Sequence, residues 1–307
     1  MSAPQAIPTP QPSRLKIWMQ AVRIFSFTAS VIPIAAGAAL ALVDDSFDLL
    51  LFLVMLLAGI ATHAGCNMAN DYYDHKKGVD TPESIGPSRV IQQGLLSPAE
   101  VKRGMIVAFA IATLLGLIVV FSAGWPILVV ALLSLAAAYF YTAGPKPLGY
   151  IALGEVTVYL FMGLAMVMGS YYVLADQVTW PSFLVGSAIG LMAAAILHAN
   201  NIRDIALDRR AGKATLATIF GRTIANWEYL ILVVSVYLCI VGLVALDLIF
   251  WPTLIAFATV PVAVRLVRLS FSKAEGPELN PLLRRSAGLH LRFGALLLVG
   301  LVMSAMI

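Results

Sequence analysis

Two short stretches of the chain place asparagine and aspartate side chains at helical spacing. The first, NMANDYYDHKKGVD, holds Asn67, Asp71 and Asp74, and the second, HANNIRDIALDRRAGK, holds Asn200, Asp204 and Asp208. Residues three or four apart lie on one face of an α-helix, so each stretch predicts a row of oxygen ligands. Two such rows facing one another would repel unless a cation lay between them.

These side chains have the chemistry of a magnesium site. Hard divalent cations prefer carboxylate and amide oxygens, and Mg²⁺ commonly completes its shell with water and with the phosphate oxygens of a substrate. Basic residues near both stretches could bind the remaining phosphate oxygens; they are Lys76, Lys77, Arg89, Lys146, Arg203, Arg209 and Arg210. The combination predicts a diphosphate substrate, against the alternative that the acids only cap helices or face water. His63 and His198, beside the two stretches, fit a packing role as well as a ligand role.

The rest of the chain is suited to a membrane. Of its 307 residues, 60% are hydrophobic and 12% are charged, which excludes large soluble domains of ordinary composition. Apolar runs of about 20 residues predict helices that cross a bilayer, and they are too long and continuous for barrel strands. We expect an all-α integral membrane protein with about nine spanning helices, at 17–43, 49–70, 105–123, 126–141, 151–174, 181–200, 227–248, 252–267 and 289–307.

All 20 lysine and arginine residues fall on one side of this arrangement. The positive-inside rule makes that side cytoplasmic, which puts the amino terminus inside and, with nine spans, the carboxyl terminus outside. Both aspartate stretches end their helices on this side, four spans apart, as expected of a duplicated four-helix unit around one cavity. Residues 1–13 are expected to form a disordered proline-rich tail, and residues 14–307 a single transmembrane domain.

The two stretches resemble the paired aspartate motifs of the UbiA superfamily of intramembrane prenyltransferases, whose members are nine-helix bundles. The segments GPSRVIQQGLLSP, YTAGPKPLGYIALGE and LNPLLRRSA are similar to the 1,4-dihydroxy-2-naphthoate polyprenyltransferase branch. Many superfamily members carry a third aspartate in the first motif. In this chain that position is Gly78, and Asp80 follows two residues later.

The resemblance implies a set of site residues. It assigns metal binding to Asn67, Asp71, Asp74, Asn200, Asp204 and Asp208, with the four aspartates as the catalytic residues. It assigns binding of the diphosphate and the acceptor to Asn67, Asn70, Lys77, Arg89, Tyr141, Lys146, Glu155, Asn200, Asn201 and Arg203. The implied cofactor is Mg²⁺, with Mn²⁺ as an alternative.

The implied reaction transfers a polyprenyl group from an allylic isoprenyl diphosphate to an aromatic acceptor, 1,4-dihydroxy-2-naphthoate or a related compound, with loss of CO₂, in menaquinone biosynthesis. The metal would weaken the allylic C–O bond, and aromatic rings would stabilise the resulting cation. Tyr72, Tyr73, Tyr139 and Tyr141 are candidates for that role or for ordinary packing. Glu155 is expected to orient an acceptor hydroxyl, unless it only joins two helices. The expected location is the bacterial cytoplasmic (inner) membrane, with the site facing the cytoplasm and no nucleic acid bound.

Several alternatives stay open from the sequence. The chain could be a UbiA-type enzyme for another aromatic acceptor, or a membrane terpene cyclase, because ionisation of the diphosphate would be the same. Intramembrane acids and internal repeats also occur in secondary transporters, whose sites usually lie near the midplane rather than at one end of the helices. An inactive scaffold is disfavoured because both motifs are intact. Prenyl chain length, oligomeric state, the role of Asp80 and a lateral opening to the lipid are left undecided.

Overall fold

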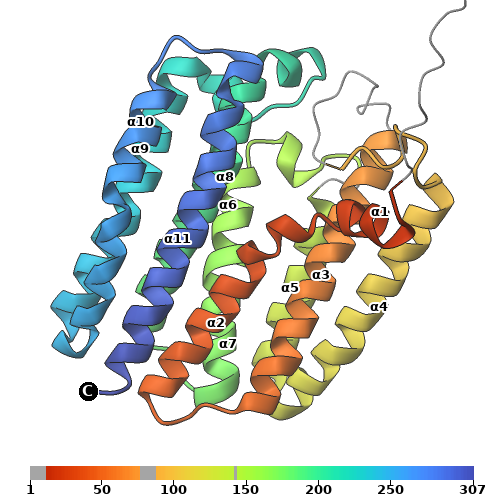
Figure 1. The fold of residues 1–307 in the computed structure, drawn as a ribbon. Helices are drawn as coiled ribbons and strands as arrows, with labels where there is room; N and C mark the ends of the chain where they lie inside the picture. The colour runs from red at the N-terminus through yellow and green to blue at the C-terminus, as the bar shows by residue number, and fades with distance from the viewer. Residues whose placement is uncertain (1–11, 77–87, 142–143) are drawn as a thin grey trace, which may run out of the picture.

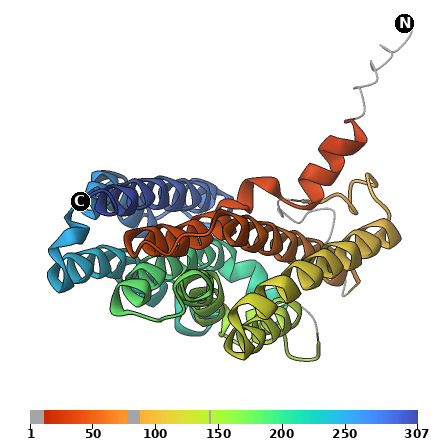
Figure 2. The same ribbon diagram turned by 90° about the horizontal axis from the view of Figure 1, so that it is seen from below.

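The computed structural model describes residues 12–76, 88–141 and 144–307, which form a bundle of long helices (Figures 1 and 2). In chain order the elements are α1 (Arg14–Ala21), η1 (Ile24–Ser26), α2 (Thr28–Val43), α3 (Leu49–Lys76), α4 (Pro98–Ala123), α5 (Trp125–Phe140), η2 (Leu148–Tyr150), α6 (Gly154–Val158), η3 (Tyr159–Ala165), α7 (Met166–Ala175), α8 (Trp180–Arg210), α9 (Leu216–Leu246), η4 (Leu248–Thr259), α10 (Val260–Ser270), η5 (Gly276–Leu279) and α11 (Asn280–Ser304). Of the η segments, η3 is a π-helix and the others are 3-10 helices. Within the described ranges, β-type pairing is limited to one bridge between Ile151 and Ala214.

The expected all-α membrane fold is confirmed. Eight helical segments in the described ranges are long and apolar enough to cross a membrane, and α5, with 16 residues, is a shorter ninth. In Figure 1 the chain leaves α3 and α8 at the top of the bundle, whereas the C-terminus lies at the bottom. The two aspartate-bearing helices therefore end at the same end of the bundle.

The expected first span, 17–43, is broken in two. The short helix α1 runs crosswise to the bundle, and α2 begins only at Thr28 (Figures 1 and 2). The break lies at Arg23, whose φ of 54° is in the left-handed region, and the 3-10 turn η1 follows it. Burial of the exposed Arg14 and Lys16 in hydrocarbon would be costly, and α1 instead packs through Ile17 and Ala21 against the ends of α3 and α4.

The helices that carry the motifs continue beyond the expected hydrophobic runs. α3 was expected to end at residue 70 and α8 at residue 200, but they end at Lys76 and Arg210. The aspartates of both motifs therefore lie on regular helix, as their spacing requires. The basic pair Arg209 and Arg210 occupies the last turn of α8, where positive charge interacts favourably with the helix dipole.

Two other expected spans are helical without being purely α-helical. The expected span 151–174 consists of the short α6, the π-helix η3 and α7. The expected span 252–267 begins as the 3-10 helix η4, with Pro252 inside it, and continues as α10. Such departures from α-helical geometry are tolerated in membranes where neighbouring helices satisfy the backbone.

Helix α8 lies at the centre of the bundle. In its most apolar 18-residue stretch, 72% of the residues are buried, compared with 17% in α3 and in α4. Glycines make this burial possible, because a Cβ placed on Gly163 of η3 would lie 2.3 Å from the Cα of Gly190 on α8. In lipid, helix association depends on such close backbone contact rather than on the hydrophobic effect.

We expect Gly163→Ala to destabilise the protein, because the added methyl group would overlap the α8 backbone at Gly190. Overpacking of this kind costs about 1–3 kcal/mol, which a lower thermal unfolding midpoint in detergent would report. The matched control is Gly169→Ala, at a position where a Cβ meets nothing within 4 Å. Its midpoint should equal that of the wild type or exceed it slightly. Equal midpoints for the two variants would contradict the close approach of η3 and α8.

Candidate active site

The first motif lies at the end of α3, beside the break between α1 and α2. Asn67 donates from Nδ2 to the backbone carbonyl of Val22 (2.8 Å) and to Oγ of Ser26 (3.2 Å). Asp71, which is 4% exposed, accepts a hydrogen bond from Nη2 of Arg23 at 2.5 Å. The left-handed turn at Arg23 thus directs a guanidinium onto the first aspartate of the motif.

His63 lies one turn before Asn67 on α3. Its Nε2 is 3.0 Å from Oγ of Ser26, and its Nδ1 is 2.7 Å from Oγ of Ser30. Both ring nitrogens are therefore engaged by serines around the start of α2. Of the two roles that the sequence left open for His63, these contacts support helix packing.

Arg203 organises the second motif on α8. It donates from Nε to Oδ1 of Asp204 (2.7 Å) and from Nη2 to Oδ2 of the same carboxylate (2.5 Å). The same Nη2 lies 2.8 Å from Oδ1 of Asn200. Nη1 reaches across to Oδ1 of Asn280, at the start of α11, at 3.2 Å. One guanidinium therefore ties the motif to a distant helix.

Lys213 brings a positive charge to the last aspartate of the second motif. Its Nζ lies 3.5 Å from Oδ1 of Asp208 and 5.6 Å from the centre of the Tyr150 ring. The backbone N–H of Ala152 donates to the carbonyl of Ala214 (2.7 Å), and the N–H of Ala214 donates to the carbonyl of Tyr150 (3.1 Å). These bonds join the loop after α8 to the segment that precedes α6, so the two loops form one edge of the site.

Tyr141 lies between the two motifs. Burial raises the pKa of its phenol, and the carboxylates of Glu155, Asp208 and Asp74 raise that pKa further. The phenol therefore stays protonated at neutral pH and is available as a hydrogen-bond donor. Because the three carboxylates belong to α6, α8 and α3, the phenol occupies a region that both motifs border.

The other candidate tyrosines contact one another between α3 and α5. The hydroxyls of Tyr73 and Tyr139 are 3.0 Å apart, and the rings of Tyr72 and Tyr73 meet edge to face with centroids 5.1 Å apart. Nζ of Lys102 lies 6.0 Å from the centre of the Tyr72 ring. These contacts support ordinary packing for Tyr72, Tyr73 and Tyr139, whereas the pKa of Tyr141 is raised by burial and by carboxylates of α3, α6 and α8.

Glu155 belongs to a buried hydrogen-bonded group that joins α6, α8 and α9. Its Oε1 lies 2.8 Å from Nδ1 of His198 and accepts a hydrogen bond from Nδ2 of Asn201 at 2.9 Å. Nε2 of His198 lies 2.8 Å from the carbonyl oxygen of Ala225. A carbonyl can only accept, so Nε2 carries a hydrogen. A further proton must then lie between Nδ1 and Oε1, on either the imidazole or the carboxyl group.

The two oxygens of Glu155 differ in their surroundings. Oε1 joins α6 to α8, which agrees with the expectation that Glu155 serves as a contact between helices. Oε2 is buried and has no hydrogen-bond partner among the described residues, and the same holds for Oδ1 of Asn201. Glu228, which sequence reasoning missed, lies 3.4 Å from Nε2 of His198. Glu228 is the one acidic residue of α9. An acid within an apolar helix is a candidate functional residue, so the sequence could have indicated it.

The remaining predicted residues are spread around this region. Lys77 and Asp80 lie outside the described residues. Asn70 and Asp74 are half-buried on α3, and Arg89 is half-buried with a left-handed φ of 54°. Lys146 is exposed, and the described part of the chain shows no contact between it and either motif. Residues that sequence reasoning did not assign to the site, in addition to Glu228, are Arg23, Lys213 and Asn280.

Comparison with known proteins decides the family. A model of the UbiA prenyltransferase family matches residues 30–284. The chain belongs to this family. It is 32% identical over 290 residues to 1,4-dihydroxy-2-naphthoate octaprenyltransferase of Bacillus subtilis, covering 94% of this chain and 93% of the relative. It is 33% identical over 302 residues to the protein of the same name from Escherichia coli, covering 96% and 97%.

A solved structure shares the fold of this UbiA-family protein. It is that of a UbiA homolog from Archaeoglobus fulgidus bound to GPP and Mg²⁺, with a TM-score of 0.66, 16% identity and coverage of 92% of this chain and 99% of the homolog. Family and fold together identify a multi-pass integral membrane prenyltransferase. The transporter alternative receives no support from either comparison.

The prenyltransferase supplies oxygen atoms suited to a divalent cation. Oδ2 of Asp71 and Oδ2 of Asp208 are buried and accept no hydrogen bond from any described residue. Across the described ranges, no three His, Cys, Asp or Glu side chains form a group that could hold a metal ion. Asp71, Asp204 and Asp208 are paired with arginine or lysine instead. The donor atoms fit Mg²⁺, provided that these basic side chains move off the carboxylates when it binds.

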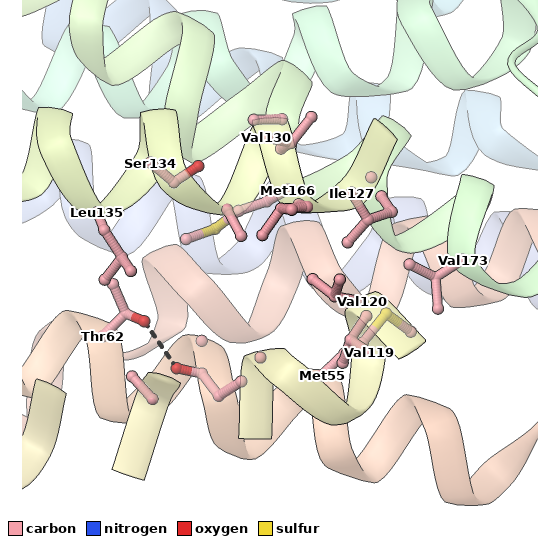
Figure 3. A pocket seen from close by; sticks show the side chains of 18 of the residues that line it. Met55, Thr62, Val119, Val120, Ile127, Val130, Ser134, Leu135, Met166 and Val173 are labelled. Atoms are coloured by element: carbon pink, nitrogen blue, oxygen red, sulfur yellow. Dashed lines mark hydrogen bonds between the residues drawn. The ribbon is translucent and has the colours of Figure 1, made fainter. Parts of the chain in front are cut away.

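An apolar pocket of about 240 Å³ lies deeper in the prenyltransferase, between α3, α4, α5 and the η3–α7 segment (Figure 3). Aliphatic side chains such as Met55, Val119 and Ile127 form most of its wall. The hydroxyl of Thr62, a polar lining residue, is used within α3, where it donates to the carbonyl of Ala58 at 2.9 Å. Thr62 precedes the first motif by about 8 Å along the helix axis.

We expect His198→Ala to lower the free energy of unfolding by about 2–4 kcal/mol, because it leaves a cavity and removes a partner of the buried Glu155 carboxyl group. Chemical denaturation in detergent would measure the change. His75→Ala, at the exposed end of α3, provides the control and should leave stability unchanged. A His198→Ala protein as stable as the control would show that the buried group does not hold α6, α8 and α9 together.

Proposed function

We propose that this prenyltransferase transfers a polyprenyl group from an allylic isoprenyl diphosphate to 1,4-dihydroxy-2-naphthoate, with loss of CO₂, in menaquinone biosynthesis. The observation that carries the proposal is the position of the two asparagine and aspartate stretches, which end α3 and α8 at the same end of the bundle (Figure 1), while an apolar pocket lies deeper between α3, α4 and α5. The names of the Bacillus subtilis and Escherichia coli relatives support the acceptor.

The proposal includes a location and a domain. The basic loops would face the cytoplasm, as the positive-inside rule states, so the site would face the cytoplasm from the bacterial inner membrane. Residues 14–307 would act as one transmembrane domain. This placement suits the chemistry, because the prenyl chain is insoluble in water and an allylic cation would react with water.

Mg²⁺ is the proposed cofactor, with Mn²⁺ as an alternative. The residues that would hold it are Asn67, Asp71, Asp74, Asn200, Asp204 and Asp208. When bound, the metal would neutralise the diphosphate and so make it a better leaving group. The Archaeoglobus fulgidus homolog, solved with GPP and Mg²⁺, supports a divalent metal in this fold.

Three basic side chains are placed to bind the diphosphate. Arg23, Arg203 and Lys213 lie 2.5, 2.5 and 3.5 Å from aspartate oxygens. A diphosphate that enters with its metal brings both the cation that the carboxylates need and the anion that the basic groups need. The guanidiniums then exchange carboxylate oxygens for phosphate oxygens, which their planar donor geometry fits equally well. Asn70, Lys77, Arg89 and Lys146 remain proposed contacts of the substrates.

The aromatic acceptor is proposed to bind beside Glu155 and Tyr141. Oε2 of Glu155 and Oδ1 of Asn201 are buried acceptors without a partner among the described residues, and the ring hydroxyls of a dihydroxynaphthoate are matching donors. The protonated phenol of Tyr141 donates to an oxygen of either substrate. A ring carbon then bonds to the allylic carbon as the C–O bond of the diphosphate breaks, and loss of CO₂ restores the aromatic ring.

The apolar pocket is proposed to hold the prenyl chain. Its wall is mostly aliphatic, and along α3 its lining runs from Thr62, about 8 Å from the first motif, to Met55, which is further from the motif (Figure 3). A chain whose diphosphate lies at the aspartates would therefore pass directly into it.

We expect Asp71→Asn and Asp204→Asn each to slow diphosphate release at least about a hundredfold, because each removes a charge that must act on the departing diphosphate through the metal. The measurement is diphosphate release by the purified protein in nanodiscs with farnesyl diphosphate, Mg²⁺ and 1,4-dihydroxy-2-naphthoate. EDTA should abolish it, and the product should be prenylated and decarboxylated by mass spectrometry.

Asp176→Asn is the matched control. Asp176 is exposed at the other end of the bundle, and its left-handed φ of 51° suits asparagine, so this variant should keep the wild-type rate. If Asp71→Asn releases diphosphate as fast as this control, Asp71 is not a residue of the active site. Metal-dependent diphosphate release that does not need the naphthoate would support the ionisation site but indicate a different reaction, either with another acceptor or as a cyclase.

Gly116→Leu tests the prenyl pocket. Gly116 lines the pocket, and a Cβ on it meets nothing within 4 Å, so a leucine side chain fills space that the prenyl chain needs. We expect the turnover of octaprenyl diphosphate to fall at least about tenfold, because its chain loses apolar contacts in the transition state. The turnover of dimethylallyl diphosphate, whose chain is short, should change little. An equal loss for both donors would place the prenyl chain elsewhere.

A further inference from the structure

A groove between α10 and α11 is lined by five arginines. Its volume is about 720 Å³, and the arginines are Arg265, Arg268, Arg284, Arg285 and Arg292. All five side chains are exposed. No candidate active-site residue lines the groove, although α11 also begins at Asn280, which accepts a hydrogen bond from Arg203.

These five arginines have no protein partner among the described residues, in contrast to the arginines that the bundle uses in its own contacts. Arg23 and Arg203 pair with aspartates, and Arg222 donates to Asn226 and to the carbonyl of Ser270. For the five groove arginines, the described part of the chain offers no hydrogen bond and no ion pair, and no acidic side chain lines the groove. Five like charges this close together repel, so the groove is suited to an anion.

The depth of the groove favours an anion that belongs to the membrane. Arg292 is the middle residue of the 25-residue helix α11, about 18 Å from either end. Since the hydrocarbon core is about 30 Å thick, a guanidinium at this height lies near or below the boundary with the headgroups. An exposed arginine there is costly unless a headgroup is drawn to it.

The surface around the groove is lipid-facing. Val264 on α10 is 42% exposed and Leu291 on α11 is 44% exposed, and each stands directly beside a groove arginine in the sequence. Val262 and Leu266 also line the groove. A ligand with an anionic head and an apolar body matches this surface, whereas a soluble anion would leave the apolar lining uncovered.

The floor of the groove is open. Arg285, Gly288 and Arg292 are three and four residues apart, so they share one face of α11. A Cβ on Gly288 would meet nothing within 4 Å, so the glycine leaves room between two guanidiniums. Guanidinium groups bind phosphate oxygens through paired N–H donors.

We propose that this groove binds the phosphate headgroup of an anionic phospholipid. The lipid would lie between α10 and α11, with its phosphate among the arginines and its acyl chains along the exposed apolar faces. Basic pockets between membrane helices commonly recognise lipid headgroups in this way.

The experiment measures lipid binding to the delipidated full-length protein by native mass spectrometry. We expect phosphatidylglycerol or cardiolipin to bind at least about tenfold more tightly than phosphatidylcholine, as several arginines near one phosphate would give. Two variants should abolish this preference, so that the affinity for anionic lipid falls to within about twofold of the affinity for phosphatidylcholine. They are Gly288→Trp, which fills the groove and keeps every charge, and the double variant Arg285→Gln/Arg292→Gln.

Two matched controls separate the groove from general effects. Ala287→Trp adds the same side chain to an exposed neighbouring position on α11, and Lys16→Gln/Arg103→Gln removes two exposed charges from α1 and α4. Both should keep the lipid preference. The proposal is overturned if Gly288→Trp also keeps the preference for anionic lipid. It is also overturned if the lipid is displaced by inorganic phosphate or by farnesyl diphosphate, each added with EDTA at the same concentration as the lipid. Displacement would assign the groove to free phosphate compounds.

Discussion

Charge compensation at one end of an apolar bundle is the constraint on which the structure depends. A carboxylate as buried as that of Asp71 loses its hydration, and an unpaired charge in that position would cost several kcal/mol. The chain meets this need with Arg23, which turns away from the helical path in a left-handed conformation to reach the aspartate. The break in the first span thus brings a guanidinium onto the buried aspartate of the candidate site. Arg203 meets the same need on α8, and its bond to Asn280 extends the pairing to α11.

The same pairing gives a physical account of how substrate could be admitted. Asp71, Asp204 and Asp208 are each balanced by a basic group from the chain. A metal and a diphosphate together can replace these pairings without leaving a buried charge alone, whereas either one alone would leave a carboxylate or a guanidinium uncompensated. Under the proposed function, this balance favours joint binding of metal and diphosphate.

The two halves of the site differ in how they are held. The α8 half is fixed from several sides, by close glycine contact with η3 and by the hydrogen bonds of Glu155, His198 and Asn201. The α3 half rests mainly on α4 and on the residues around Arg23, and far more of α3 faces lipid. The apolar pocket lies on this less enclosed side. Under the proposed function, the enclosed α8 face would hold the reacting groups, and the more exposed α3 side would take the prenyl chain.

The sequence alone determined the membrane class, the approximate positions of the apolar helices and the two motifs, because each follows from local composition or from helical spacing. It could not determine which basic residue pairs with which acid. Arg23 lies 48 residues from Asp71, and Asn280 lies 77 residues from Arg203, and no local pattern joins such distant positions. The hydrogen-bond partners of Glu155 and His198 were likewise undecided, since a buried acid or histidine can be joined to any helix that packs against it. Only the tertiary structure decided these points, because a charge inside a low-dielectric bundle takes its partner from whichever chain segment the helix packing brings within reach.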